Sequence, residues 1–403
     1  MKNVVLISID CLRADYAGYT EDAKLKPPCI TYLAENGYAY ENCIVQAPFT
    51  TTSHASMLSG LYPFEHGIRH LRGEQLSSDV RMIQHDLKAR GYVTYGFVSC
   101  YHMSHIGLHH GFDEYRFDPN VINDDKGRKV YTIAEEVTNR AIKKLAENKR
   151  TFLFLHYFDA HVHVGYEYEP LYYDAIMRVD EQIRRIVNYC GEDTLFIITA
   201  DHGRKMSGEH NYPYLQPRNP EFNPLPCTYT KSKVGNGAEL YDEIMRVPLI
   251  VYNGNGYNVK EIDCQSVIQS IDIGNIIRSE LDGVCYGRNR EYAYMETFSP
   301  DQLFEEAIPL IGLRTNDWKL ICYQTKISGN NRTFVPAELY NLKDDPKEKR
   351  NIIGDNRALA RRLAENLAGI LKPRKRTRYS AEPIEDEEYK RTITDRLRAM
   401  GYI

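Results

Sequence analysis

A run of β-branched and leucine residues, Val4–Ile9, opens the chain and stops abruptly at Asp10. An apolar run of this length without polar alternation is typical of a strand that is buried on both faces of a parallel sheet. A second run, Thr194–Thr199, is followed two residues later by another acid, Asp201. Between these runs, strand-like segments alternate with helix-like ones. This alternation predicts a layered α/β fold with a central, mostly parallel sheet and right-handed crossovers.

Other segments continue the alternation along the first part of the chain. Two further strands are expected at Tyr92–Ser99 and Thr151–Leu155. Helices are expected, from apolar residues that recur with a helical period, at Ile30–Asn36, Val80–Arg90, Thr132–Asn148 and Leu171–Cys190. We therefore expect residues 1–290 to form one large α/β domain.

The residues after 290 follow a different pattern. Strands are expected at Glu291–Glu296, Ile311–Tyr323 and Glu338–Asn341, the last two antiparallel, and a helix at Arg357–Leu371. This order is typical of an α+β unit, so we expect residues 291–403 to form a small C-terminal domain. Within it, the basic stretch Lys372–Arg378 precedes the acidic stretch Glu382–Glu388, which indicates a solvated linker.

The composition excludes several classes of protein. Of 403 residues, 42% are apolar and 26% are charged, and the net charge of −4 offers no basic surface for nucleic acid or an acidic membrane. No stretch reaches the ~20 apolar residues of a membrane span, and we find no signal-peptide pattern at the N-terminus. The nine cysteines are scattered and never spaced as CxxC. We therefore expect reduced thiols and a cytoplasmic location, while the oligomeric state is not indicated.

The acids that follow the two apolar runs are candidates for a shared site. Ligands of open parallel sheets lie beyond the carboxyl ends of the strands, so Asp10 and Asp201 should face one crevice. Asp201 is followed by His202 and Gly203, and glycine allows the sharp turn that brings adjacent ligands to a site. Each acid alone is weak evidence, because many acids after strands cap helices, and that alternative stays open.

A hydroxyl-rich segment, Ala47–Gly60, predicts a loop that leads into a short helix. Its first hydroxyls, which include Thr50, could cap the helix. The same geometry suits an anion, because a helix N-terminus presents free N–H groups and a positive dipole end. A hydroxyl placed there beside a metal can also ionise and act as a nucleophile. These residues alone leave both interpretations open.

Further motifs follow in order along nearly the whole chain. They are Leu12–Asp15, Ser53–Pro63, Phe154–His161, Asp201–Gly203, Gly208–His210, Leu240–Glu243, Arg246–Ile250, Trp318–Leu320, Glu338–Leu342, Asp345–Pro346 and Met400–Ile403. With these motifs the chain resembles the sulfatase-like branch of the alkaline phosphatase superfamily. The resemblance implies a metal-dependent hydrolase with Asp10, Asp201 and His202 as metal ligands. It places Thr50 at the position of the nucleophile, which also contacts the metal.

The segment at the nucleophile departs from the sulfatase pattern. Sulfatases resemble Cys-x-Pro-Ser-Arg here, with the cysteine oxidised to formylglycine, whereas this chain has Thr50, Thr51, Thr52, Ser53 and His54. Threonine cannot become an aldehyde, because its carbinol carbon already carries a methyl group. It can form a phosphoryl ester that water then hydrolyses, as in the Thr-using members of the superfamily. The expected substrate is therefore a small anionic ester of phosphate type, with sugar-linked esters among the candidates.

Two other departures from the family pattern concern the metal. Calcium-type sulfatases usually place a second Asp where this chain has Cys11, and many use Asn where it has His202. Losing a hard carboxylate and gaining an imidazole favours Mn²⁺ or Zn²⁺ over Ca²⁺. We interpret Cys11 as a small buried filler in preference to a soft-metal ligand.

Three histidines have expected roles at this site. His161 and His210 are candidates for binding the phosphate or for carrying protons of the leaving group. His54 stands where the family has Arg and is a candidate for orienting Thr50. Asp159, His161 and His210 could alternatively hold a second metal, as in two-metal phosphodiesterases.

Several other polar residues are weaker candidates. Lys205 and Lys233 could bind the substrate anion, although an exposed lysine is the favoured interpretation of each. Arg13 is expected to pair with an acid behind the metal site. The long, Pro-rich segment Asn211–Asn236 could form a rim that selects the substrate or a variable surface loop. The least favoured histidines are His156 and His163.

The leading hypothesis is a hydrolase of phosphodiesters, phosphomonoesters or phosphonate esters with a covalent Thr50 intermediate. The alternatives are a sulfatase, a phosphoryl-group transferase and a catalytically silent binding protein of the same fold. Retention of Asp10, Thr50, Asp201 and His202 together argues against a silent protein.

Overall fold

The computed structural model of the chain describes most of its residues. The described residues are 2–69, 74–117, 121–123, 129–148, 150–161, 169–206, 239–254, 262–284, 286, 290–297, 310–328, 331–372, 379–384, 386, 387, 391 and 395.

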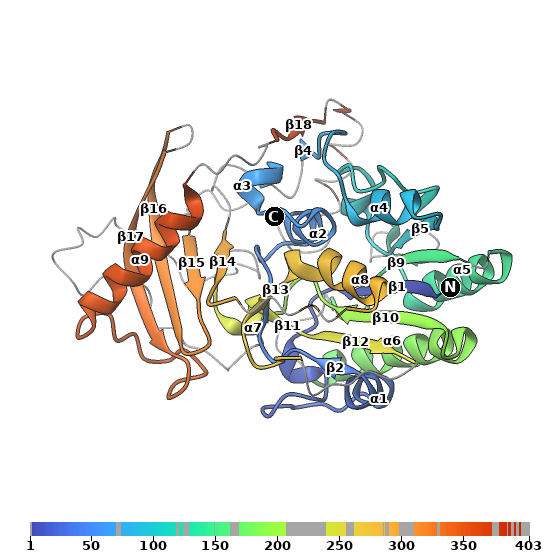
Figure 1. Cartoon of the computed structure of the whole chain (residues 1–403), viewed down its shortest axis with the longest axis horizontal. Helices are drawn as coiled ribbons and strands as arrows, with labels where there is room; N and C mark the ends of the chain where they lie inside the picture. The colour runs from blue at the N-terminus through green and yellow to red at the C-terminus, as the bar shows by residue number, and fades with distance from the viewer. Residues whose placement is uncertain are drawn as a thin grey trace.

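A seven-stranded sheet forms the centre of the molecule (Figure 1). In spatial order its strands are β2 (Tyr38–Ala39), β12 (Leu249–Asn253), β10 (Thr194–Thr199), β1 (Asn3–Ile9), β9 (Thr151–Tyr157), β5 (Val93–Val98) and β6 (Glu114–Phe117). The five strands from β10 to β6 are parallel to their neighbours, and β12 is antiparallel to β10. The four strands predicted from apolar runs are all present. Every side chain of β9 and β10 is buried, as expected for strands covered on both faces.

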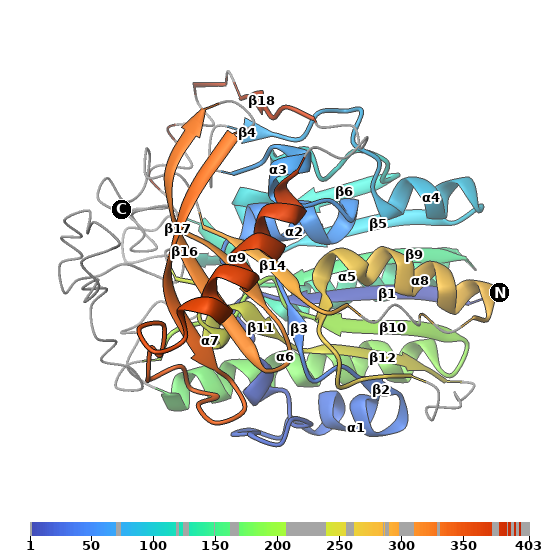
Figure 2. The same ribbon diagram turned by 60° about the vertical axis from the view of Figure 1, so that its left-hand side comes forward.

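Helices cover both faces of this sheet (Figures 1 and 2). One layer contains α1 (Pro28–Asn36), α5 (Ala134–Glu147) and α6 (Glu169–Cys190). The other contains α2 (Thr50–Ser59), α4 (Ile83–Ala89) and α8 (Ile273–Asp282). The predicted α/β layered architecture is thus confirmed. Among the described residues, no helix has the length and apolar character needed to cross a membrane.

Short elements complete the large α/β unit. They are α3 (Pro63–His66), α7 (Asp242–Met245), β3 (Cys43–Ile44), β4 (Glu74–Gln75), β7 (Val121–Asn123), β8 (Lys129–Thr132), β11 (Arg246–Val247) and β13 (Ile268–Gln269), with 3₁₀ turns at Ala14–Tyr16, Tyr101–Ser104 and Ser270–Asp272. Strands β11, β3 and β13 pair as a small sheet.

The start of α4 and the end of β9 differ from the predicted boundaries. Helix α4 begins at Ile83, not Val80, because Nδ1 of His85 accepts the Met82 N–H at 3.1 Å and caps the first turn. Strand β9 continues two residues beyond Leu155, to Tyr157. His156, which lies one residue beyond the predicted strand, is therefore part of β9.

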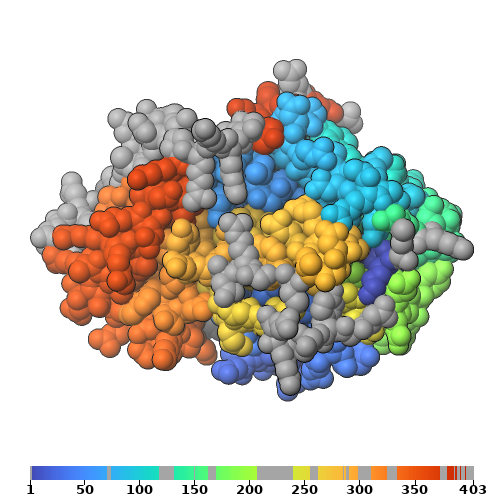
Figure 3. All heavy atoms as spheres, viewed as in Figure 1, coloured from blue at the N-terminus to red at the C-terminus, as the bar shows by residue number. Residues whose placement is uncertain are grey.

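A separate antiparallel sheet follows in sequence and lies to one side of the large unit (Figures 1 and 3). Its strands are β14 (Ala293–Glu296), β15 (Leu310–Arg314), β16 (Trp318–Ser328) and β17 (Asn331–Asn341), and α9 (Arg357–Leu371) packs on it. The single strand predicted at Ile311–Tyr323 is wrong, because a turn closed by Thr315 N–H to Trp318 O at 2.7 Å divides it into β15 and β16. The domain boundary between residues 290 and 291 stays a prediction.

A buried charge network connects this sheet to the large unit. Nζ of Lys319 lies 2.5 Å from Asp242 and 2.6 Å from Glu348, and it donates to Leu240 O at 3.1 Å. Lys319 has no exposed surface. A buried ammonium group with two carboxylates and a carbonyl is well compensated, so this network joins α7 to β16.

The C-terminal tail returns to the large unit. Its strand β18 (Glu382–Pro383) pairs antiparallel with β4, and Tyr379 N–H donates to Glu65 O at 2.8 Å. The side chains of β18 are exposed, as expected for the acidic stretch. The backbone there is nevertheless part of a sheet, so a free linker is the wrong description of residues 382–383.

Candidate active site

The carboxyl ends of β1 and β10 bring two buried acids together. The strands are parallel and adjacent, with Ser8 in register with Thr199, so Asp10 and Asp201 emerge at the same edge of the sheet. Both acids are fully buried. Oδ1 of Asp201 accepts the N–H groups of Cys11 at 3.2 Å and of His202 at 2.8 Å.

Thr50 is the first residue of α2, and its hydroxyl lies against this pair of strand ends. Its Oγ1 donates to Oδ2 of Asp10 at 3.3 Å and lies 3.5 Å from Nε2 of His202. Ser53, one turn further along, donates to the backbone oxygen of Asp201 at 2.6 Å. The helix is therefore attached to the β10 end, and the Thr50 hydroxyl stays beside both candidate ligands.

The close approach at Gly203 makes this arrangement possible. Its N–H donates to Ile244 O at 2.7 Å, and a Cβ at this residue would lie 2.2 Å from Glu243 O. No side chain fits at that distance, which explains why glycine follows His202.

Asp10, Asp201 and His202 have the arrangement of a metal site. Their ligand atoms lie within 4.8 Å of one another, and all three residues are buried. Oδ1 of Asp10 and Oδ2 of Asp201 accept no hydrogen bond from the described residues. Burial raises the pKa of Asp10, while the charge of His202 and hydrogen bonds from Cys11 and Thr50 oppose the rise. Two buried carboxylates with unsatisfied oxygens fit a divalent cation, which would compensate their charge.

His54 contacts Thr50 through the backbone and not through the hydroxyl. Its Nδ1 lies 2.6 Å from Thr50 O, and its Nε2 lies 2.8 Å from Oγ of Ser8. Burial lowers the pKa of His54 to about 3, so the ring is neutral. Because both nitrogens have hydrogen-bond partners, His54 can position Thr50 only by holding the first turn of α2 against β1.

The structure adds His156, which the sequence did not favour. Its Nε2 lies 3.3 Å from Oδ2 of Asp10, and its ring meets that of His54 edge to face with centroids 5.1 Å apart. Burial lowers its pKa to about 4. The ligand atoms of His54, His156 and Asp201 lie within 4.8 Å of one another. The register of β9 places His156 opposite Ser8 on β1, and no local pattern in the sequence indicates this register.

His161 lies at the same edge of the sheet, on the turn after β9. Its ring stacks on Phe158, with centroids 4.4 Å apart and planes 10° apart. Its ligand atom lies within 4.8 Å of those of Asp10 and Cys11. Asp159 accepts the Ala134 N–H at 2.9 Å, and burial raises its pKa to about 6. Among the described residues, Asp159 belongs to no cluster of three ligand atoms of this kind.

Three cationic side chains, Arg13, Arg204 and Lys205, lie close in the sequence to Asp10 or Asp201. Arg13 forms an ion pair with Asp15 at 2.6 Å and lies 3.7 Å from Glu243, as expected for a structural role. Arg204 is buried and donates to Ala160 O at 3.2 Å. Lys205, a candidate for the substrate anion, lies 3.1 Å from Glu239. The remaining candidates, His163, His210, Lys233 and the segment Asn211–Asn236, lie outside the described residues.

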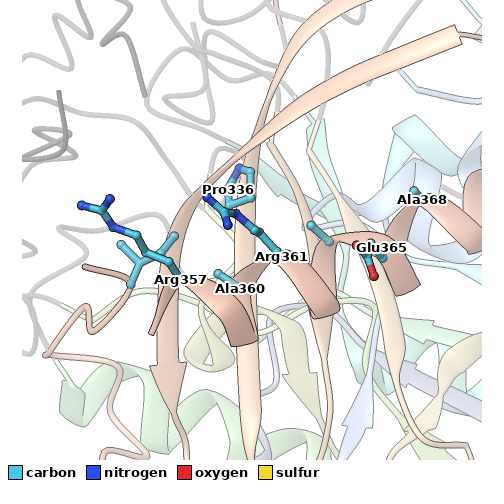
Figure 4. Close-up of a pocket in the computed structure, with 8 residues that line it drawn as sticks. Pro336, Arg357, Ala360, Arg361, Glu365 and Ala368 are labelled. Carbon is cyan, nitrogen blue, oxygen red and sulfur yellow. The ribbon is translucent and has the colours of Figure 1, made fainter. Parts of the chain in front are cut away.

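A groove of about 470 Å³ lies elsewhere, along α9 in the C-terminal unit (Figure 4). Pro336, Ile353 and one face of α9, with Arg357 and Arg361, line it. Its lining residues include no histidine, cysteine or hydroxyl side chain. We therefore do not include it in the candidate active site.

Comparison with known proteins agrees with this geometry. The sulfatase family model matches residues 2–274. The uncharacterized sulfatase YidJ of Escherichia coli (strain K12) is 28% identical over 213 residues, which are 48% of this chain and 35% of that protein. The chain therefore spans about a third of the length of this curated relative.

Two solved structures share the fold. The phosphonate monoester hydrolase of Agrobacterium radiobacter has a TM-score of 0.68 and 17% identity, over 92% of this chain and 95% of its own. A protein solved in complex with its substrate, D-glucosamine-2-N,6-O-disulfate, has a TM-score of 0.65 and 15% identity, over 93% of this chain and 99% of its own. The family match covers well over half of the residues, so the chain belongs to the sulfatase family of ester hydrolases.

Proposed function

We propose that this chain is a metal-dependent hydrolase of phosphate-type esters and that Thr50 is its nucleophile. The observation that carries the proposal is the position of the Thr50 hydroxyl, 3.3 Å from Asp10 and 3.5 Å from His202. A threonine that only capped a helix would need no contact with two candidate metal ligands. The cap function itself is absent, because Thr50 is the first helical residue and Phe49 stands at the cap position.

A divalent ion held by Asp10, Asp201 and His202 would supply positive charge to the threonine oxygen and to the phosphoryl oxygens. This donor set, two carboxylates and one imidazole, suits Mn²⁺ or Zn²⁺ better than Ca²⁺. The role of the chain is to hold these buried donors together with the hydroxyl of Thr50 beside Asp10 and His202.

The proposed reaction has two displacements at phosphorus. In the first, Oγ1 of Thr50 releases its proton to solvent and attacks phosphorus, and an O–P bond forms as the bond from phosphorus to the ester oxygen breaks. The leaving alcohol takes a proton from solvent or from His161, whose ligand atom lies within 4.8 Å of that of Asp10. In the second, water attacks phosphorus and breaks the bond to Thr50, which restores the free hydroxyl.

The start of α2 supports the charge that develops in both steps. Thr50 is the first residue of α2, so the positive end of the helix dipole lies beside its hydroxyl. A dipole fixed before the reaction stabilises developing charge without reorganising. The site therefore combines a nucleophile at the start of α2, a candidate cation site at the ends of β1 and β10, and the positive end of a helix dipole.

The substrate class is inferred from two solved structures with the same fold and from the identity of residue 50. A phosphonate monoester hydrolase shares the fold, which supports a phosphorus ester. A protein that binds a disulfated glucosamine shares it as well, so a sugar-linked anion is a reasonable substrate, and a sulfate ester is the second candidate. Thr50 in place of an oxidisable cysteine favours phosphorus.

The test uses purified protein with its metal content measured. We would compare hydrolysis of p-nitrophenyl phosphate, bis-p-nitrophenyl phosphate and p-nitrophenyl sulfate by wild type, Thr50→Ala and Thr50→Ser. We expect a metal-dependent activity on a phosphate ester that Thr50→Ala lowers at least ~10³-fold and that Thr50→Ser partly retains. Thr52→Ala, which removes a buried hydroxyl from the same helix, is the matched control. Preference for the sulfate ester, or full activity of Thr50→Ala, would refute the proposal.

A further inference from the structure

A second group of ligand atoms shares Asp10 with the candidate metal site. The ligand atoms of Asp10, Cys11 and His161 lie within 4.8 Å of one another, and all three residues are buried. This is a carboxylate, a thiol and an imidazole, so the group differs in chemistry from the set of Asp10, Asp201 and His202. The described residues contain no other cluster of this kind that includes a cysteine.

The backbone directs the Cys11 side chain into this position. Cys11 has a φ of 63°, in the left-handed region that a side chain rarely adopts. Its N–H donates to Asp201 at 3.2 Å, and its carbonyl oxygen accepts the Tyr172 hydroxyl at 2.7 Å. The conformation is therefore held on both sides. It places Sγ 3.7 Å from Nδ1 of His202, beside the first site.

Asp10 has the capacity to serve both groups. Its Oδ2 faces Thr50 and His156, each at 3.3 Å. Its Oδ1 is buried and accepts no hydrogen bond from the described residues. A carboxylate oxygen in that state is costly unless a cation or donor compensates it. A carboxylate has two oxygens, so Asp10 can contact an ion in each of the two ligand groups.

We propose that Asp10, Cys11 and His161 bind a second divalent ion of the thiophilic class, such as Zn²⁺, bridged to the first through Asp10. This inference rests on the proposed function, since the first ion uses the same carboxylate. When the sulfur–metal bond forms, the Cys11 thiol releases its proton to solvent. Sulfur, nitrogen and oxygen donors together select Zn²⁺ over Ca²⁺ or Mg²⁺, and three protein ligands leave a coordination position open.

The proposed second site differs from the set of Asp159, His161 and His210 that the sequence suggested. It assigns His161 to Cys11 and Asp10, with its ring orientation set by the stack on Phe158. As a ligand, His161 would not carry the proton of the leaving group. Cys11 would then be a ligand and not a filler.

The test measures bound metal directly and does not need activity. Three metal-stripped proteins are compared: wild type, Cys11→Ser and the control Cys43→Ser. Each is titrated with Co²⁺ while its absorption spectrum is recorded. The number of Zn²⁺ ions bound per chain is measured separately after dialysis. We expect wild type and Cys43→Ser to bind two ions and to show a thiolate-to-cobalt charge-transfer band. Cys11→Ser should keep one ion and lose the band. Cys43 is also fully buried but belongs to no described cluster of ligands.

Other outcomes separate this inference from the proposed function. One ion per wild-type chain without the charge-transfer band would overturn the second site, and if Asp201→Asn removes that ion the first site stands. No bound ion at all would overturn both. If circular dichroism shows that Cys11→Ser does not fold, His161→Gln is used in its place. We expect His161→Gln to lose the second ion. If it still binds two ions, the proposal is contradicted.

Discussion

Nε2 of His156 lies 3.3 Å from Oδ2 of Asp10, and neither side chain has any exposed surface. The ring occupies the space behind the candidate metal ligand, at the end of β9. A buried group that touches a ligand fixes the direction of that ligand, and such contacts typically affect metal affinity strongly. We therefore predict that His156 positions Asp10 and does not touch the substrate.

Replacing His156 with Gln should weaken binding of the first ion by roughly 10- to 100-fold, because Asp10 loses its neighbour on the β9 side. Equilibrium dialysis against Zn²⁺ or Mn²⁺ measures this affinity. His66→Gln is the matched control, since His66 is equally buried but hydrogen-bonds to Ser56 at 2.9 Å, away from the site. Equal affinities for the two variants would show that His156 does not position Asp10.

Removal of metal should lower the stability of the folded chain. Asp10 and Asp201 then lie buried beside each other without compensation of their charge. An ion at 100 times its Kd adds about 2.7 kcal/mol to the free energy of unfolding, so the Tm of stripped protein should rise with Zn²⁺ or Mn²⁺ and less with Ca²⁺. Thermal scans with and without chelator measure this. Asp201→Asn should abolish the shift, whereas a shift lost equally in the exposed control Asp317→Asn would argue against the site.

Gly203→Ala should destabilise the chain by about 1–3 kcal/mol, because its Cβ would lie 2.2 Å from Glu243 O and the backbone must move. The shift would also displace His202, so metal affinity should fall with it. Chemical denaturation gives the free energy of unfolding. Gly369→Ala on α9 is the control: a Cβ there meets nothing within 4 Å, and alanine should stabilise the helix by about 1 kcal/mol. A neutral Gly203→Ala would contradict the close approach.

Glu338 should make stability depend on pH. Burial raises the pKa of this carboxyl to about 7, although it accepts hydrogen bonds from the hydroxyls of Tyr340 and Tyr241. A raised folded-state pKa means that folding favours the protonated acid. Its contribution is therefore fully present below the unfolded pKa, about 4.5, and is lost as pH rises to about 7.

Replacing Glu338 with Gln should remove this dependence. Relative to Glu338→Gln, wild type should lose on the order of 3 kcal/mol between pH 4.5 and pH 8. Urea unfolding at several pH values provides the comparison, with Glu365→Gln on the exposed face of α9 as control. Parallel stability curves for wild type and Glu338→Gln would show that Glu338 stays ionised in the folded chain.

The core of the fold and of the candidate site follows from local sequence patterns. Val4–Ile9 and Thr194–Thr199 are long apolar runs, so each strand can be located without knowledge of its partners. The rule that parallel strands present their carboxyl ends at one edge then brings Asp10 and Asp201 together. The structure agrees with both steps.

The residues that sequence reasoning missed depend on pairing between distant strands. The position of His156 requires the register of β9 against β1, which no local pattern contains. The pairing of β18 with β4 joins two strands of two residues each, with exposed side chains in β18 and no apolar alternation to mark it. The grouping of Cys11 with His161 depends on a left-handed φ at a residue that is not glycine.

The central position of β1 has a consequence for synthesis on the ribosome. This strand is translated before β9 and β10, yet it lies between them, so Val4 cannot pair until Phe152 or Leu195 has been synthesised. Until then an apolar segment of the nascent chain lacks its partner strands, a state that is prone to aggregation and that chaperones commonly protect. The same order of events means that Asp10 cannot share an ion with Asp201 until Asp201 has left the exit tunnel.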